Sequence, residues 1–166
     1  MDKQYEALFT PWKIGNVEIK NRIVMCPMGG TSLFGWFELG GCHFDKEAAK
    51  LFLERANNNV GLIIPGIAPL RDTFWGKWLW QNPKMFEDLK EFMDEIHKTG
   101  AKLFVQLTAG MGRSWAITEL IGPLHKNKFT RALIKPVIDT SHELACPSPQ
   151  PARWAPDIIC PEMTVE

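Results

Sequence analysis

The sequence predicts an α/β fold with a parallel sheet, and three observations favour that class. Short apolar runs recur at intervals of roughly forty residues through the first two thirds of the chain. Amphipathic stretches with helical spacing lie between those runs. Gly, Pro or Asn residues mark where runs and stretches end. Strands that alternate with helices in this way form βα units, so we expect the strands to be adjacent and parallel.

The first predicted elements are a hairpin and a strand. Trp12–Ile14 and Val17–Ile19 are short alternating runs around the turn residues Gly15 and Asn16, which predicts a small β-hairpin. The run Arg22–Cys26 is apolar after its first residue and is followed by a proline. Such a run is typical of a strand that is buried on both faces.

A glycine-rich loop, Gly29–Gly41, separates this strand from the first predicted helix. The stretch Asp45–Asn57 places apolar residues at helical spacing among Lys and Glu, and Asp45 lies where a carboxylate complements the helix dipole. Val60–Ile64 then predicts a second buried strand. A strand, a helix and the next strand make up the first βα unit.

A second unit follows a long loop that is rich in Trp. Lys84–Lys98 is amphipathic and precedes Gly100, which favours a helix C-cap, and Lys102–Leu107 predicts a third apolar strand. Beyond this strand the pattern is lost, because residues 108–163 contain many Pro, Gly and polar residues. Only Lys126–Ile134 is modestly apolar there.

The last residues suggest a barrel that stops part-way. Met163–Glu166 has the pattern of a helix start, with Thr164 as N-cap. A complete (β/α)₈ TIM barrel needs about 250 residues, more than this chain contains. We therefore expect a single domain, residues 1–166, that forms a partial (β/α)₈ barrel of the first three to four βα units with an N-terminal β-hairpin.

Charge and composition exclude several functional classes. Nineteen basic residues balance 19 acidic ones without a long single-sign run, so neither nucleic acid nor a membrane is an expected partner. The N-terminus has no apolar segment behind a basic start, which predicts a cytoplasmic protein. The spacing of the four cysteines matches no zinc or iron–sulfur motif. We expect isolated reduced thiols at Cys26, Cys42, Cys146 and Cys160, and no metal site.

Two groups of side chains have open interpretations. The loop Phe74–Trp80 could form the wall of a pocket for a flat apolar substrate, because barrel active sites form at the ends of strands. Packing of these tryptophans onto their own loop is the favoured alternative. His43, His97, His125 and His142 show no catalytic arrangement and are expected on the surface or on helices.

Six short segments carry a family resemblance: Leu8–Gly15, Lys20–Met28, Gly61–Ile64, Gln106–Arg113, Pro147–Pro149 and Met163–Glu166. The first two resemble the opening of old yellow enzyme relatives, which are flavin-dependent TIM-barrel NADH oxidoreductases. The other four are most similar to 2-enoate reductases, 2,4-dienoyl-CoA reductases and bile-acid-inducible steroid reductases of that family. The likeness extends over essentially the whole chain.

The resemblance implies an FMN site at the ends of the predicted strands. After the first strand, Cys26, Pro27, Met28 and Gly29 would contact the isoalloxazine ring, and Gly29 would permit close approach. Gly66 and Ile67 would provide a second contact after the second strand.

Gln106 would hydrogen-bond the pyrimidine edge of the flavin. An amide inside the apolar run 103–107 would be costly to bury without a partner, and it both donates and accepts hydrogen bonds. A core glutamine satisfied by neighbouring backbone is the alternative.

By the same resemblance, the full-length relative would be an FMN-dependent ene-reductase. NAD(P)H would supply the hydride, and an enoate, enoyl-CoA or steroid-like enone would be the substrate. No residue of this chain is expected to be catalytic. The family's catalytic Tyr, its substrate-binding His/Asn pair and its phosphate-binding arginines would lie beyond residue 166, as would the 4Fe-4S and FAD sites of multidomain relatives.

Two alternatives to this function remain open. In the first, the chain is a non-catalytic fragment that forms a homo-oligomer or pairs with a missing C-terminal half. In the second, it belongs to another flavin or phosphate barrel that places its ligand at the strand ends in the same way.

Overall fold

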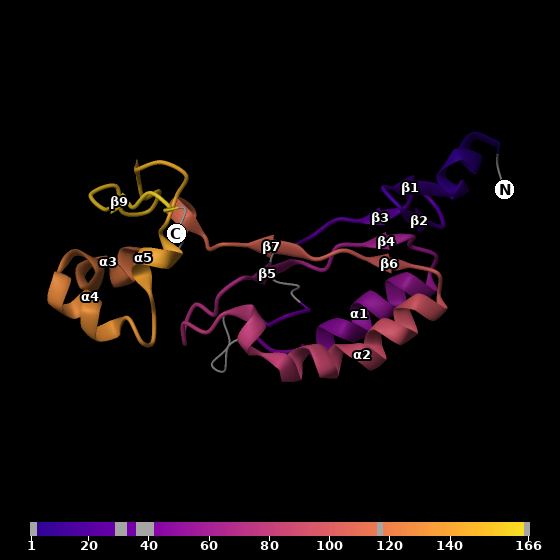
Figure 1. Ribbon diagram of the computed structural model, residues 1–166. Helices are drawn as coiled ribbons and strands as arrows, with labels where there is room; N and C mark the ends of the chain where they lie inside the picture. The colour runs from indigo at the N-terminus through magenta and orange to yellow at the C-terminus, as the bar shows by residue number, and fades with distance from the viewer. Residues whose placement is uncertain (1–2, 29–32, 36–41, 116–117, 165–166) are drawn as a thin grey trace. The chain divides into compact units, whose positions relative to one another are not determined.

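The structure is a computed structural model that describes residues 3–28, 33–35, 42–115 and 118–164 (Figure 1). Of the sequence predictions, Gly29, most of the glycine-rich loop and Glu166 lie outside the described residues. The chain divides into two compact units. Unit 1 consists of Met1–Trp36, Cys42–Ala68 and Asn82–Leu107, and unit 2 consists of Phe37–Gly41, Pro69–Gln81 and Thr108–Glu166.

Unit 1 begins with a 3₁₀ helix, η1 (Lys3–Phe9), and a β-hairpin. The strands β1 (Trp12–Ile14) and β2 (Val17–Ile19) pair antiparallel, and Gly15 takes a φ of 57° in the turn between them. That left-handed conformation has little steric cost for glycine. The predicted hairpin is therefore confirmed.

Three short strands form the parallel sheet of unit 1, in the order β3 (Val24–Met25), β4 (Leu62–Ile63) and β6 (Lys102–Leu103). Met25 is aligned with Ile63, and Ile63 is aligned with Leu103. The prediction of adjacent parallel strands is confirmed. Burial differs along the sheet, because β4 has a neighbour on each side and is buried, whereas β3 and β6 are half-buried. The expectation that the first strand is buried on both faces was wrong.

Two amphipathic helices, α1 (Lys46–Asn57) and α2 (Pro83–Lys98), run side by side along one face of this sheet (Figure 1). The Asp45 side chain accepts hydrogen bonds from the backbone N–H groups of Glu47 and Ala48, which confirms its predicted place at the start of α1. The buried residues of both helices recur at spacings of three to four and face the sheet: Ala49, Phe52 and Ala56 in α1, and Met85, Leu89, Phe92 and Ile96 in α2.

Asn21 joins several segments at the start of the sheet. Its buried side chain donates from Nδ2 to the Asn59 carbonyl at 2.7 Å and accepts at Oδ1 from the Ile23 N–H at 3.0 Å. Its own carbonyl accepts from the indole N–H of Trp12 at 2.7 Å. Gly61 passes so close that a Cβ there would lie 2.3 Å from the Asn21 Oδ1. Asn21 therefore connects the hairpin, β3 and the turn before β4.

Beyond β4 and β6 the chain continues into a second pair of strands, β5 (Ile67–Pro69) and β7 (Gln106–Thr108). The predicted strand Lys102–Leu107 is thus two strands, separated at Phe104 and Val105. The first part belongs to the three-stranded sheet, and the second pairs with β5.

Unit 2 contains regular structure that the sequence pattern did not indicate. Its described residues form three helices, α3 (Thr118–Lys126), α4 (Lys128–Ile134) and α5 (Thr140–Glu143), an antiparallel pair, β8 (Gln150–Pro151) and β9 (Ile159–Cys160), and two short 3₁₀ helices, η2 (Leu79–Gln81) and η3 (Gly112–Ser114). Its core gathers around Trp115, Leu144 and Ile158. Thr164 has no regular structure, and residues 165 and 166, where the expected helix would begin, lie outside the described residues, so that expectation stays untested.

Within the described part of the chain, no helix has the length and apolar character needed to cross a membrane.

Candidate functional site

The parallel register brings the predicted site residues of unit 1 to equivalent positions. Backbone hydrogen bonds extend the ladder one residue past the strands, from the Ile64 N–H to the Met25 carbonyl and from the Phe104 N–H to the Ile63 carbonyl, both at 2.9 Å. Residues 25, 63 and 103 are aligned across the three strands. The residues three positions further along the chain are 28, 66 and 106. Met28, Gly66 and Gln106 therefore follow the three strand ends at matching positions.

Most side chains at these strand ends are exposed. Cys26, Pro27 and Gln106 are exposed, as is Met28, at 50%. The apolar neighbours of Gln106 are exposed too, with 46% for Val105 and 56% for Leu107. An exposed apolar surface that includes an amide suits a flat ring with donors and acceptors on its edge.

The structure corrects the expected environment of Gln106. The sequence predicted a buried amide inside an apolar strand, but the ladder of β6 ends at Leu103 and the Gln106 side chain is exposed. The polar atoms of its amide therefore lose no free energy to burial within this chain. They are accessible to a ligand instead.

Gly66 and Ile67 differ from their neighbours at the strand ends. Gly66 is buried and has a φ of 47°, a conformation that is strained for most residues with a side chain, and Ile67 is half-buried. Glycine takes this conformation without the steric cost of a Cβ. Gly29, the fourth residue predicted after the first strand, lies outside the described residues.

The strand ends contain no cation. None of residues 26–28, 64–67 and 104–107 is Lys or Arg. Phosphate groups are usually held by such side chains or by helix N-termini. The residues present therefore fit the isoalloxazine part of FMN and offer no side chain for its phosphate.

Unit 2 contains a charged cluster that the sequence did not reveal. Arg71 forms an ion pair with Asp139 at 2.9 Å, with side-chain exposures of 19% and 10%. The Arg71 Nε donates to the Gly76 carbonyl, and its guanidinium carbon lies 5.3 Å from the centre of the Trp78 ring. Trp78 also contacts His142 edge-on, at 5.5 Å between ring centres. Trp78 thus packs onto its own loop and onto α5, as the favoured interpretation of the Trp-rich loop predicted, whereas Trp75 and Trp80 are exposed, at 44% and 73%.

Glu143 is the most perturbed carboxyl of this cluster. It is 3% exposed, and burial is the main cause that raises its pKa to about 7. The carboxylates of Asp139 and Asp72 raise the pKa further, while a hydrogen bond with Thr73 and the charge of Arg71 lower it. These residues lie up to about seventy positions apart in the sequence, so no local motif could have indicated the cluster.

Two histidines of unit 2 are shielded from solvent, His125 fully and His142 in part. His125 is buried, with its Nδ1 2.8 Å from the Thr140 hydroxyl, and burial lowers its pKa. Burial also lowers the pKa of His142, with a further decrease from Arg71 that Asp139 partly opposes. Because both are on helices, the sequence prediction was right about their location and incomplete about their burial.

Cys146 and Cys160 lie together in the core of unit 2, although they are far apart in the sequence. Burial and the neighbouring Cys146 raise the pKa of the Cys160 thiol to about 11, so it is protonated at neutral pH. The expectation of isolated thiols was wrong for this pair. Among the described residues, no three His, Cys, Asp or Glu side chains are grouped as metal ligands.

Comparison with known proteins is consistent with a flavin site. The sequence pattern of the NADH:flavin oxidoreductase / NADH oxidase family matches residues 7–121. Cinnamate reductase from Clostridium sporogenes is 32% identical over 173 aligned positions, which cover 100% of this chain and 22% of that protein.

Solved structures show the same fold. The old yellow enzyme from Trypanosoma cruzi superposes with a TM-score of 0.51 and 27% identity, over 64% of this chain and 28% of that one. A complex of 2-naphthoyl-CoA reductase with 2-naphthoyl-CoA superposes with a TM-score of 0.59 and 23% identity, over 96% of this chain and 23% of that one. The chain thus spans less than a third of the length of each of these relatives.

The family pattern includes all three parallel strands and the residues that follow them, and the relatives that share the fold are TIM barrels of which this chain matches only a part. The chain therefore belongs to the NADH:flavin oxidoreductase / NADH oxidase family, and its βα units are those of a partial TIM barrel of the old yellow enzyme type.

Proposed function

We propose that residues 1–166 form the N-terminal portion of an FMN-binding barrel domain that reduces an activated carbon–carbon double bond with NAD(P)H. The observation that carries this proposal is the parallel register of β3, β4 and β6, because Met28, Gly66 and Gln106 each come three residues after the end of one of these strands. Active sites of barrels form at the carboxyl ends of the strands. Family membership supports FMN as the ligand of this site.

Each strand end has a distinct role in this proposal. The Gln106 amide donates to and accepts from the pyrimidine edge of the ring, because it is exposed and has both kinds of group. Gly66 lets the backbone approach the ring, and Ile67 packs beside it. Cys26, Pro27, Met28 and Gly29 cover the ring from the first strand. FMN, when bound, supplies the hydride chemistry, and the protein supplies orientation and electrostatics.

The proposed substrate class is an α,β-unsaturated carboxylic acid. The relative that matches over the whole of this chain is named for its action on cinnamate, which supports an enoate first. Enoyl-CoA thioesters and steroid-like enones also contain a carbon–carbon double bond conjugated to a carbonyl group, and we propose to assay them as further substrates. We place the activity in the cytoplasm, as the sequence analysis predicts.

A second candidate is a non-catalytic fragment that forms a homo-oligomer or pairs with a C-terminal half. The exposed apolar side chains of unit 1 favour it, since Met28, Val105 and Leu107 are each about half exposed. The outer strands β3 and β6 each have only one neighbour in the described sheet.

Fluorescence titration of FMN tests the proposed function. The isolated chain should bind FMN weakly, and addition of the remaining barrel segments should increase the affinity. In that assembled barrel, Gln106→Leu should weaken binding by about 1–3 kcal/mol, the usual cost of an unsatisfied polar partner. Gln150→Leu, a change of an exposed glutamine on β8, is the matched control. Equal affinities of the Gln106→Leu variant and the unmodified barrel would contradict the proposed role of this amide.

A further inference from the structure

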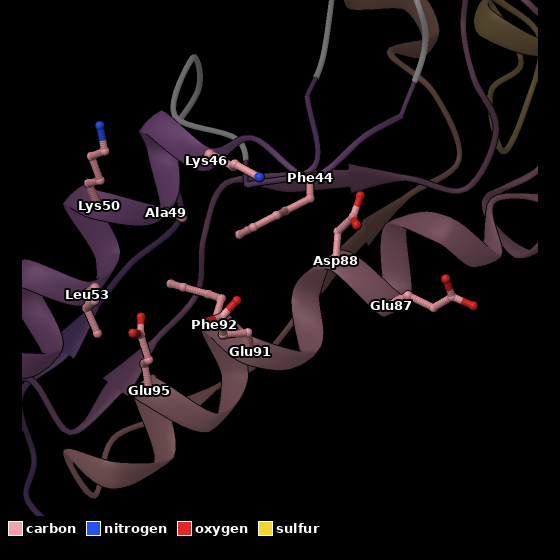
Figure 2. Close-up of a pocket in the computed structure, with 10 residues that line it drawn as sticks. All are labelled: Phe44, Lys46, Ala49, Lys50, Leu53, Glu87, Asp88, Glu91, Phe92 and Glu95. Carbon is pink, nitrogen blue, oxygen red and sulfur yellow. The ribbon is translucent and has the colours of Figure 1, made fainter.

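A groove lies between α1 and α2, with a hollow of about 430 Å³ (Figure 2). Its floor is apolar: Ala49 and Phe92 are buried, and Phe44 and Leu53 are half-buried. The rings of Phe44 and Phe92 lie 5.6 Å apart at an angle of 43°. The groove shares no residue with the strand ends.

The two edges of this groove carry opposite charges. Lys46 and Lys50 line it from α1, and Glu91 and Glu95 line it from α2. All four side chains belong to exposed residues. Figure 2 shows Lys50 extending away from α2, and Lys50 forms its ion pair with Glu47 of its own helix at 2.7 Å. No ion pair between the four edge residues is found in the described structure.

This charge pattern is complementary to itself. A two-fold axis parallel to the two helices places α1 of one copy opposite α2 of the other, so each lysine edge faces a glutamate edge. A uniformly basic partner would be repelled by Lys46 and Lys50, and a uniformly acidic partner would be repelled by Glu91 and Glu95. The formal net charge of the chain is zero, so two copies have no overall charge repulsion to overcome.

We propose that a second copy of this chain covers the groove between α1 and α2, with the lysine edge of each copy against the glutamate edge of the other. The proposal specifies a surface for the self-association put forward above and is independent of flavin binding. Lysine side chains have long apolar stems, so the stems from one copy lie over the phenylalanine floor of the other while their ammonium groups reach the glutamates. This arrangement fills the hollow and pairs the lysines of each copy with the glutamates of the other.

Sedimentation velocity with two charge-reversed variants tests this surface. The unmodified chain should form dimers in a concentration-dependent manner. Lys46→Glu with Lys50→Glu makes both edges acidic, and Glu91→Lys with Glu95→Lys makes the α2 edge basic at these two positions, with Glu87 and Asp88 unchanged. Each double variant alone should dissociate at least about tenfold more readily, because like charges then face each other. An equimolar mixture of the two should restore dimers, since their edges are again complementary.

Two controls keep the test specific. Lys3→Glu with Lys90→Glu has the same change in net charge as the first variant, at exposed positions outside the groove, and should leave the dimer unchanged. Far-ultraviolet circular dichroism checks that each variant is folded. The proposal is overturned if the unmodified chain stays monomeric, if each reversed variant associates as the unmodified chain does, or if mixing folded variants restores no dimer. Their affinity for FMN is a separate measurement, so the two proposals can fail independently.

Discussion

At the scale of single residues, the segments that resemble the flavoprotein family contain two kinds of position. Asn21 and Arg22 hold the fold together, since Asn21 bonds to Asn59 and the Arg22 Nε donates to the Thr10 hydroxyl at 3.0 Å. Cys26, Pro27 and Met28 are exposed. The motif alone could not separate these roles, because Asn59, which accepts from the Asn21 side chain, lies 38 positions further along the chain.

Asn21→Ala should lower the free energy of unfolding by about 1–3 kcal/mol, because it leaves the Asn59 carbonyl and the Ile23 N–H without their partner. Urea unfolding followed by tryptophan fluorescence measures this loss. Asn57→Ala, at an exposed position at the end of α1, should change stability by less than about 0.5 kcal/mol. Equal effects of the two substitutions would show that the Asn21 contacts do not stabilise the fold.

Glu143 makes stability depend on pH. Its pKa is about 7 in the folded chain against an ordinary value of 4.5, so the folded state keeps a proton that the unfolded state releases in this range. The stabilising contribution is complete below about pH 4.5 and is lost as the pH rises to about 7. Glu143→Gln does not titrate. Relative to the unmodified chain it should gain about 1–3 kcal/mol of stability between pH 4.5 and 8.

Unfolding free energies of both proteins across that pH range check this prediction. The lowered pKa values of His125 and His142 make stability rise with pH, in a window that overlaps the Glu143 range. The comparison therefore uses the difference between the two proteins, in which the histidine contributions cancel. A difference that stays constant from pH 4.5 to 8 would mean that the Glu143 carboxyl titrates normally.

At the scale of elements, length decided what could be predicted from the sequence. The helices α1 and α2 have 12 and 16 residues, long enough for the apolar period to repeat several times. The helices of unit 2 have nine, seven and four residues, and Pro123 lies inside the first of them. In such short helices the apolar spacing repeats too few times to be recognised, and the proline interrupts it further. No residue pattern marks the end of β6 either, so the sequence predicted that Gln106 lies in a buried strand.

The N-cap of α1 gives a test at this scale. Asp45→Ala removes the acceptor for two backbone N–H groups and should cost about 1 kcal/mol. Asp45→Asn keeps a side-chain oxygen at the cap and should retain most of that stability, so the pair separates capping from charge. Thermal unfolding of the three proteins measures both effects. Equal losses in the two variants would assign the effect to the negative charge at the helix dipole.

At the scale of the whole molecule, three parallel strands in register end in segments that we propose contact the isoalloxazine ring. None of these strand ends contains Lys or Arg for the phosphate. The positions of these residues could be predicted, because βα spacing and the carboxyl ends of strands follow from the sequence. The clusters of unit 2 could not, because they depend on contacts between distant segments.

The most direct test of the central claim is a titration of the ¹⁵N-labelled chain with FMN, followed by two-dimensional NMR. We expect weak binding that shifts the resonances of the Gly66 amide and of the Gln106 side-chain amide. Excess inorganic phosphate should not reverse these shifts. Phosphate should fail to compete because these strand ends have no cation to hold it. Shifts confined to residues away from the strand ends, or displacement of FMN by phosphate, would contradict the claim that these residues hold the isoalloxazine ring.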